Sequence, residues 1–151
     1  MTRLTFAAFA LALGAPLTVQ PATAQQGVPG GHFIENWDLD RDGAVTPLEA
    51  RTKRDELFVM FDADGSGSLD SAEYDLFDET RDADIATNAG GKGPGPMQPV
   101  VEGLVRGFND TDDDGLVSRD ELADRTADWF PLMDRNGDGL VTTADFGPPR
   151  G

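Results

Sequence analysis

The chain has 151 residues, enough for one domain or two small ones, and 28 acidic residues against 12 basic ones give it a net charge of −16. This excess of negative charge argues against nucleic acid and anionic membranes as partners, because both would repel the chain. There is no cysteine, which excludes disulfides, cysteine nucleophiles and zinc–thiolate sites. A small acidic domain without disulfides needs another source of stability, and bound metal is the obvious candidate.

Residues 1–24 have the layout of a secretory signal peptide. Arg3 supplies the positive charge, residues 4–13 form an apolar run, and Ala-Thr-Ala at 22–24 is a small-x-small cleavage site. The run is too short for a membrane span, which needs about 20 residues. We therefore expect a periplasmic or secreted protein that begins near Gln25 and has no membrane anchor after cleavage. An uncleaved anchor is the alternative.

A short acidic repeat occurs four times after this segment. Asp-x-Asp-x-Asp/Ser-Gly begins at Asp38, Asp62 and Asp110, and Asp-x-Asn-x-Asp-Gly begins at Asp134. The spacing is the same within the first two and within the last two repeats, and twice as large between these pairs. The repeats therefore predict two halves, one made of the first two repeats and one of the last two.

The boundaries of these halves are set by the stretch at 86–97. Glycine and proline dominate it and it has no carboxylate, which is typical of a flexible linker; a decayed loop is the alternative. The expected halves are 32–85 and 98–147.

The residues that flank the repeats predict helices. Thr46-Pro47-Leu48-Glu49 has a capping residue, proline at the first helical position and glutamate three residues after the cap. The residues at 70–73 and 118–121 repeat the capping pattern. The loops within each half are separated only by residues 50–61 and 122–133. One helix must therefore leave one loop and enter the next, and Pro131 should shorten or kink the second of these helices. With no strand signal beyond one or two residues per loop, the class is all-α.

Apolar residues at helical spacing in these connecting segments predict the core. They are Leu57, Phe58, Phe61, Leu122, Trp129, Phe130 and Met133.

Each repeat has the residues that a 12-residue calcium loop requires. Calcium takes six to eight oxygen ligands, and such a loop supplies them from positions 1, 3, 5, 7, 9 and 12, with glycine at position 6 for a sharp turn and a backbone carbonyl at position 7. The first loop, 38–49, offers Asp38, Asp40, Asp42, the carbonyl of Ala44, Thr46 and Glu49. The second, 62–73, offers Asp62, Asp64, Ser66, the carbonyl of Ser68, Asp70 and Glu73.

The second half of the chain repeats this set. The third loop, 110–121, offers Asp110, Asp112, Asp114, the carbonyl of Leu116, Ser118 and Glu121. The fourth, 134–145, offers Asp134, Asn136, Asp138, the carbonyl of Leu140, Thr142 and Asp145. Position 8, where paired loops usually share a short two-stranded bridge, is always apolar: Val45, Leu69, Val117 and Val141. A solvated acidic face or a disordered tail would not place glycine at every sixth position.

These loops resemble the EF-hand family over nearly all of 32–146, and the chain also resembles bacterial secreted EF-hand proteins with four short-spaced loops. The resemblance implies two pairs of helix–loop–helix units, the first loop with the second and the third with the fourth, joined by the 86–97 linker. It implies up to four calcium ions.

Two loops depart from the pattern. Before the third loop, Arg106 and Asn109 stand where the other loops have apolar residues, which predicts a looser site. The fourth loop ends in Asp145, one methylene short of glutamate, which predicts single-oxygen coordination or acceptance of magnesium.

The function that these features favour is calcium binding without catalysis, as a buffer or a calcium-stabilised module. Sensors use a Met-rich groove between long helices, and the expected mature chain has only Met60, Met97 and Met133. One alternative is a calcium-dependent interaction module with an unidentified protein partner. Such a module would be either a sensor or a protein like the dockerins, whose loops the fourth loop resembles.

Lanthanide capture, as in lanmodulin, is a further alternative, but that family's proline at loop position 2 is missing. An enzyme is the remaining one: His32 is the only histidine and has no obvious nucleophile to serve.

Overall fold

The computed structural model describes residues 27–88 and 94–147. The expected signal peptide lies outside the described residues, and so does the 89–93 part of the expected linker. Within the described residues, no helix combines the length and the apolar character that crossing a membrane requires.

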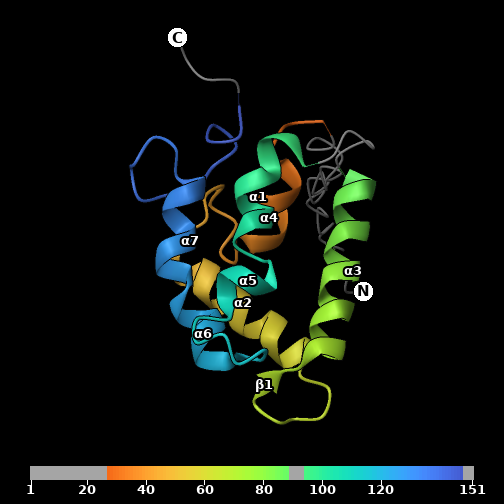
Figure 1. Cartoon of the computed structure of the whole chain (residues 1–151). Helices are drawn as coiled ribbons and strands as arrows, with labels where there is room; N and C mark the ends of the chain where they lie inside the picture. Colours follow the sequence, from red (N-terminus) through yellow and green to blue (C-terminus); the bar gives the residue numbers. More distant parts are fainter. Residues whose placement is uncertain (1–26, 89–93, 148–151) are drawn as a thin grey trace, which may run out of the picture.

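The protein is mostly helical, which confirms the all-α class. Its elements in chain order are α1 (Gly31–Trp37), α2 (Pro47–Phe61), β1 (Ser68–Leu69), α3 (Ser71–Asn88), the 3₁₀ turn η1 (Gly95–Met97), α4 (Gln98–Glu102), α5 (Arg106–Asn109), β2 (Val117–Ser118), α6 (Arg119–Asp124) and α7 (Thr126–Met133). In Figure 1, α3 stands on one side of the molecule and α6 with α7 on the other. The stretch expected as a linker therefore begins inside α3 and includes η1.

Helix α2 begins as the sequence predicts. The hydroxyl of Thr46 accepts a hydrogen bond from the backbone NH of Glu49, and the Glu49 carboxylate accepts one from the NH of Thr46. Ser118 and Glu121 form the same capping box at α6, and Asp70 and Glu73 exchange the same pair of bonds at α3. Each capping box satisfies NH groups that have no partner within the first turn of its helix.

The connection between the third and fourth loops differs from the expectation of one helix that Pro131 shortens. It consists of two helices, α6 and α7, with Arg125 at their junction. Pro131 lies inside α7, which continues to Met133 directly before the fourth loop. A proline removes one helical NH, but α7 continues through Pro131. The interruption of the helix lies earlier, at Arg125.

The pairing of the loops is different from the one expected. Strand β1 of the second loop pairs antiparallel with β2 of the third, so that Leu69 lies opposite Val117. Val45 of the first loop bridges Val141 of the fourth. The expected pairs, first with second and third with fourth, are therefore wrong, although the four position-8 residues do form the bridges.

The continuity of α2 is the physical reason for this pairing. Its 15 residues make a rod about 22 Å long at 1.5 Å per residue, which holds the first and second loops at opposite ends. Helix α2 also contacts α6 and α7. The two bridges require α2 and the α6–α7 segment to run antiparallel, which brings the second loop to the third and the first to the fourth.

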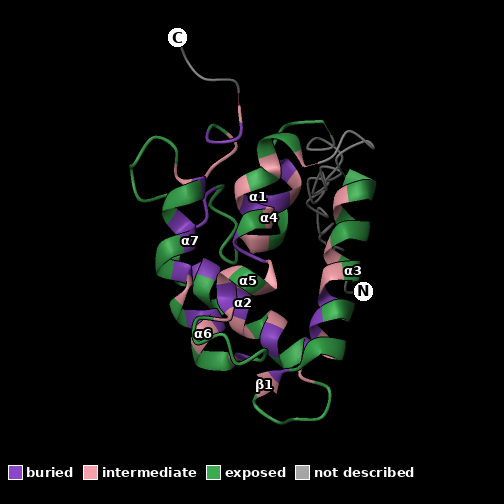
Figure 2. Ribbon diagram, in the orientation of Figure 1, coloured by how far each residue is buried: buried purple, intermediate pink, exposed green. Residues whose placement is uncertain are grey.

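The core lies where these helices meet. Phe58, Phe61 and all four predicted residues of the second connection are buried, and Leu57 packs against them partly exposed. The position-8 residues are buried too. Figure 2 shows buried residues along the facing sides of the helices, whereas the loops are largely exposed.

Candidate metal-binding loops

The four loops share one turn geometry. The carboxylate of the first aspartate accepts a hydrogen bond from the NH of the sixth-position glycine, at 2.8 Å in the first and fourth loops and 3.1 Å in the second and third. These glycines have φ between +84° and +93°, a region that a residue with a Cβ enters only with strain. The backbone thus wraps around the first aspartate in each loop.

The twelfth residue closes each loop. One Glu49 oxygen accepts the NH and the hydroxyl of Thr46, both at 2.8 Å, and the other accepts the NH of Leu39 at 2.9 Å. Equivalent NH groups bind Glu73 and Glu121 in their own loops. Each glutamate therefore reaches back across its loop.

These contacts favour the ionised form of two of the glutamates, Glu49 and Glu121, by lowering their pKa values. Partial burial raises the pKa of Glu49, but the hydrogen bonds from Thr46, Leu39 and Asp40 outweigh it, so that the pKa lies below the ordinary value. The same balance at Glu121, with donors from Ser118 and Thr111, lowers its pKa to about 2. An ionised carboxylate is the form that binds a cation.

Three loops bring carboxylates together at positions 1, 3 and 12. In each, one carboxylate oxygen per residue lies within 4.8 Å of the others. The clusters are Asp38, Asp40 and Glu49; Asp62, Asp64 and Glu73; and Asp110, Asp112 and Glu121. At Asp40, slight desolvation and the charges of Asp42, Glu49 and Asp38 raise the pKa, as expected for like charges placed together.

The other predicted ligands shape the loops. At position 5, Asp42, Asp114 and Asp138 accept the NH of the seventh residue at 2.8–3.0 Å, and Ser66 donates its hydroxyl to the Ser68 carbonyl at 2.8 Å. None of them joins the carboxylate clusters. At position 9, Thr46, Asp70 and Ser118 cap the helices that follow, and Thr142 donates to Asp145 at 3.2 Å.

The fourth loop reaches the same arrangement with a shorter side chain. One Asp145 oxygen accepts the NH of Thr142 at 2.8 Å and the other accepts the NH of Arg135 at 3.2 Å. The Arg135 side chain, which the sequence analysis did not single out, donates to the carbonyls of Asp145 and Gly147 at 2.9 and 2.7 Å. In the described residues no helix follows this loop, and Arg135 supplies donors to carbonyls that an exiting helix would otherwise pair.

The donor set fits calcium. Carboxylate, hydroxyl and carbonyl oxygens are the ligands that this hard cation prefers. An observation at the third loop supports the fit: Oδ1 of Asp110 is buried and accepts no hydrogen bond. A buried carboxylate oxygen without a donor is costly, and a cation within the loop would satisfy it.

The third loop gathers the same three carboxylates as the first two loops, but Oδ1 of Asp110 lacks the NH donors that the first aspartate has in the other loops. The looser site that the departing residues predict therefore stays a prediction. Asn109 is completely buried, and Arg106 donates to the Ser71 carbonyl and the Asp75 carboxylate, both at 3.0 Å. The polar residues that interrupt the apolar pattern therefore have specific partners. Asn109 has Arg54 of α2 as a partner, whose guanidinium donates to the Asn109 amide oxygen. The sequence signal for this contact was Arg54 itself, a charged residue four positions before Phe58 on the buried face of α2.

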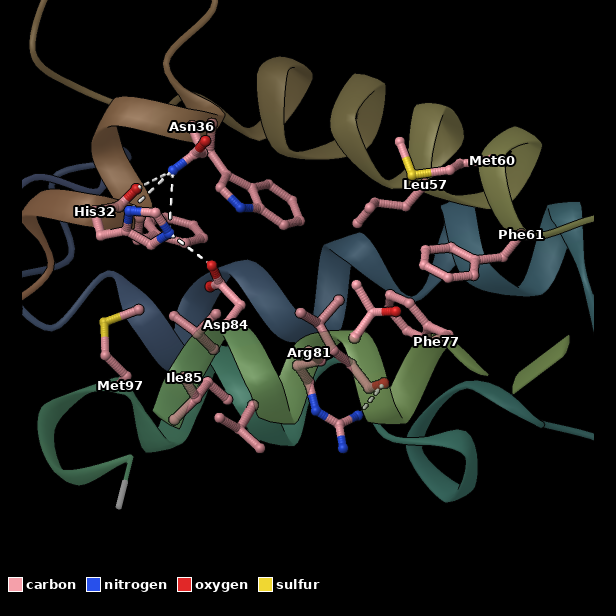
Figure 3. A pocket seen from close by; sticks show the side chains of 16 residues that line it. His32, Asn36, Leu57, Met60, Phe61, Phe77, Arg81, Asp84, Ile85 and Met97 are labelled. Carbon is pink, nitrogen blue, oxygen red and sulfur yellow. Dashed lines mark hydrogen bonds and ion pairs between the residues drawn. The ribbon is translucent and has the colours of Figure 1, made fainter. Parts of the chain in front are cut away.

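His32 lies on α1 and lines an apolar pocket of about 310 Å³. Its Nε2 is 3.0 Å from Oδ1 of Asp84, and Asn36 lies beside it (Figure 3). The ring is paired with a carboxylate on α3 in an exposed position.

Comparison with known proteins supports one family. A family model described as EF hand matches residues 54–78 and 126–147, which include the second loop with the end of α2 and the fourth loop with all of α7. Comparison with curated proteins gives no match. The two matches support the EF-hand superfamily for this chain, and the first and third loops show the same turn geometry as the matched ones.

Proposed function

We propose that this protein binds calcium ions through four EF-hand loops. The observation that carries the proposal is the convergence of three carboxylates at positions 1, 3 and 12 of three loops, each with a glycine turn at position 6. The fourth loop has the same turn and a twelfth carboxylate held by equivalent NH groups. A divalent cation at each loop relieves the repulsion among these charges.

The role that we propose is a buffer or a calcium-stabilised module in the periplasm or outside the cell, without catalysis. The secretory layout of residues 1–24 supports the location. Mass spectrometry of the exported protein tests the location: a product that begins near Gln25 is expected, and retention of the full chain in the cytoplasm contradicts it.

Calorimetric titration with calcium, with far-ultraviolet circular dichroism in parallel, tests the proposed binding. We expect saturable binding of up to four ions. Glu49→Gln and Glu73→Gln should each remove most of the affinity of their own loop, because the neutral amide cannot coordinate the ion with two oxygens.

Glu79→Gln is the matched control, because it makes the same charge change at an exposed position of α3. It should leave the titration unchanged. Equal effects of Glu79→Gln and Glu49→Gln would show that bulk charge, not loop coordination, holds the ions.

A further inference from the structure

The segment between α4 and α5, residues 103–105, presents its backbone carbonyls to side chains of other elements. The Gly103 carbonyl accepts Arg54 Nη1 at 2.9 Å and Asn109 Nδ2 at 3.2 Å. The Leu104 carbonyl accepts the Tyr74 hydroxyl at 3.0 Å, and the Val105 carbonyl accepts Asn109 Nδ2 at 2.9 Å. A helix break in a buried position therefore keeps its carbonyls paired.

Asn109 is the centre of this network. It is 0 % exposed, and its Oδ1 accepts a hydrogen bond from Nη2 of Arg54 while its Nδ2 donates to the Tyr74 hydroxyl at 3.0 Å. Because a guanidinium only donates, Arg54 fixes which end of the Asn109 amide carries the oxygen. Arg54 is itself 0 % exposed and lies over the Trp129 ring, so the whole network is held within the core.

The two ends of the network adjoin two different metal loops. Tyr74 directly follows Glu73, the twelfth residue of the second loop, and Asn109 directly precedes Asp110, the first residue of the third. The bond between Tyr74 and Asn109 therefore connects the last ligand of one loop to the first ligand of its partner through a single buried contact.

Asp110 is the residue through which an ion in the third loop would act on this contact. Its Oδ2 accepts the NH of Gly115, but its buried Oδ1 has no donor. An ion in the third loop would draw this oxygen toward itself, and the adjoining Asn109 amide is hydrogen-bonded to both Tyr74 and Arg54. A shift at Asp110 would then act on Tyr74 through Asn109, and through Tyr74 on the neighbouring Glu73.

We propose that Asn109 is a positioning residue for Asp110, and that its hydrogen bond to Tyr74 couples calcium binding in the second and third loops. This inference rests on the proposed calcium-binding function. It adds a side-chain route to the β1–β2 backbone pairing that also joins these loops. The two routes are separable, because side-chain substitutions leave the backbone pairing in place.

The test is a comparison of Tyr74→Phe with Thr126→Val. Each substitution removes one buried hydroxyl, but that of Thr126 has no hydrogen-bond partner, so it serves as the matched control. In each background, the calcium affinity of the second loop is measured with the third loop intact and with the third loop disabled by Glu121→Gln. The NH signal of Gly67 follows the second loop, because that NH binds the Asp62 carboxylate.

In the unmodified protein and in Thr126→Val, Glu121→Gln should weaken the second loop by about fivefold or more. In Tyr74→Phe, this fold-change should fall to less than half of that value. A second readout is the side-chain NH₂ signal of Asn109 in the calcium-loaded protein, which should exchange with solvent faster in Tyr74→Phe and not in Thr126→Val.

Equal fold-changes in the two variants, or no coupling in the unmodified protein, would overturn the inference while leaving calcium binding itself intact. Absence of calcium binding in the unmodified protein would overturn the proposed function and this inference together.

Discussion

Val45 and Val141 exchange two backbone hydrogen bonds, of 2.8 and 2.9 Å, although one lies in the first loop and the other in the fourth. Both side chains are buried. This bridge, together with the pairing of Leu69 with Val117, makes each acidic loop the neighbour of a loop from the other half of the chain.

Glu49→Gln should therefore weaken calcium binding in the fourth loop more than in the second. Loss of the Glu49 carboxylate releases the end of the first loop, and Val45 transmits the change to Val141 through their two hydrogen bonds. We expect about a fivefold or larger loss at the partner loop. The measurement is a calcium titration that follows the NH signals of Gly139 and Gly67.

Glu73→Gln provides the reciprocal arm of this experiment. It should weaken the third loop, which β1 and β2 join to the second, and leave the fourth largely unaffected. A stronger effect of Glu49→Gln on the second loop than on the fourth would contradict the pairing.

The pairing illustrates what the sequence predicts and what it leaves open. Local patterns act over a few residues, so the capping boxes, the turn glycines and the apolar position-8 residues were all predictable. Which bridge residue meets which depends on the length and continuity of α2, a property of the whole helix. The short spacing between loops did contain this information, because one helix of three to four turns cannot return its two ends to the same place.

The Arg54 network marks another limit of the sequence. The departures at Arg106 and Asn109 were visible as interruptions of an apolar pattern, but a pattern shows only that a polar residue stands at a buried position. The partners of Asn109, Tyr74 and Arg54, lie on other helices far away in the sequence, and their positions depend on how those helices pack.

Replacement of Arg54 by methionine should destabilise the calcium-loaded protein by about 3 kcal/mol. Burial lowers the pKa of Arg54 to about 10, yet its side chain pairs the carbonyls of Leu122 and Gly103 and the Asn109 amide. Methionine would remove the Arg54 donors from the Leu122 carbonyl and the Asn109 amide oxygen and would leave the Gly103 carbonyl with Asn109 Nδ2 alone. Denaturant unfolding measures the difference.

Arg51→Met is the control for this change. Arg51 is on the same helix, but its ion pair with Asp124 is exposed, and its loss should cost less than about 1 kcal/mol. Similar losses in both variants would show that the buried network contributes little.

Gly103→Ala should destabilise the protein by about 1–3 kcal/mol through overpacking. A Cβ at this position would lie 1.7 Å from Cδ1 of Trp129, a contact that requires the indole or the helix break to move. Gly107→Ala, in α5 with nothing within 4 Å of its added Cβ, should be neutral or stabilising by up to about 1 kcal/mol. Thermal unfolding of both variants in calcium tests the contrast, and a tolerated Gly103→Ala would mean that Trp129 is not packed as described.

Removal of calcium should leave the protein substantially less ordered. The clustered carboxylates repel one another without a cation, and the core of a small domain cannot overcome that repulsion, so binding energy contributes to folding. Far-ultraviolet circular dichroism should show a loss of helix in chelator that millimolar calcium reverses. Identical spectra in chelator and calcium would contradict this expectation.

The fourth loop should discriminate least between calcium and magnesium. Asp145 has one methylene fewer than Glu49, yet it binds the equivalent NH groups, of Thr142 and of Arg135. A shorter side chain that reaches the same groups requires a contracted loop, and magnesium favours a tight octahedron with ligands at about 2.0–2.1 Å.

The pair of reciprocal substitutions Asp145→Glu and Glu49→Asp tests this reasoning. Asp145→Glu should raise the calcium affinity and selectivity of the fourth loop, because the longer side chain can place two oxygens on the larger ion. Glu49→Asp should shift the first loop toward magnesium. Magnesium competition against calcium, followed through the NH signals of Gly139 and Gly43, measures both loops in one experiment. If magnesium displaces calcium from the fourth loop equally well before and after Asp145→Glu, the length of the twelfth side chain does not set its selectivity.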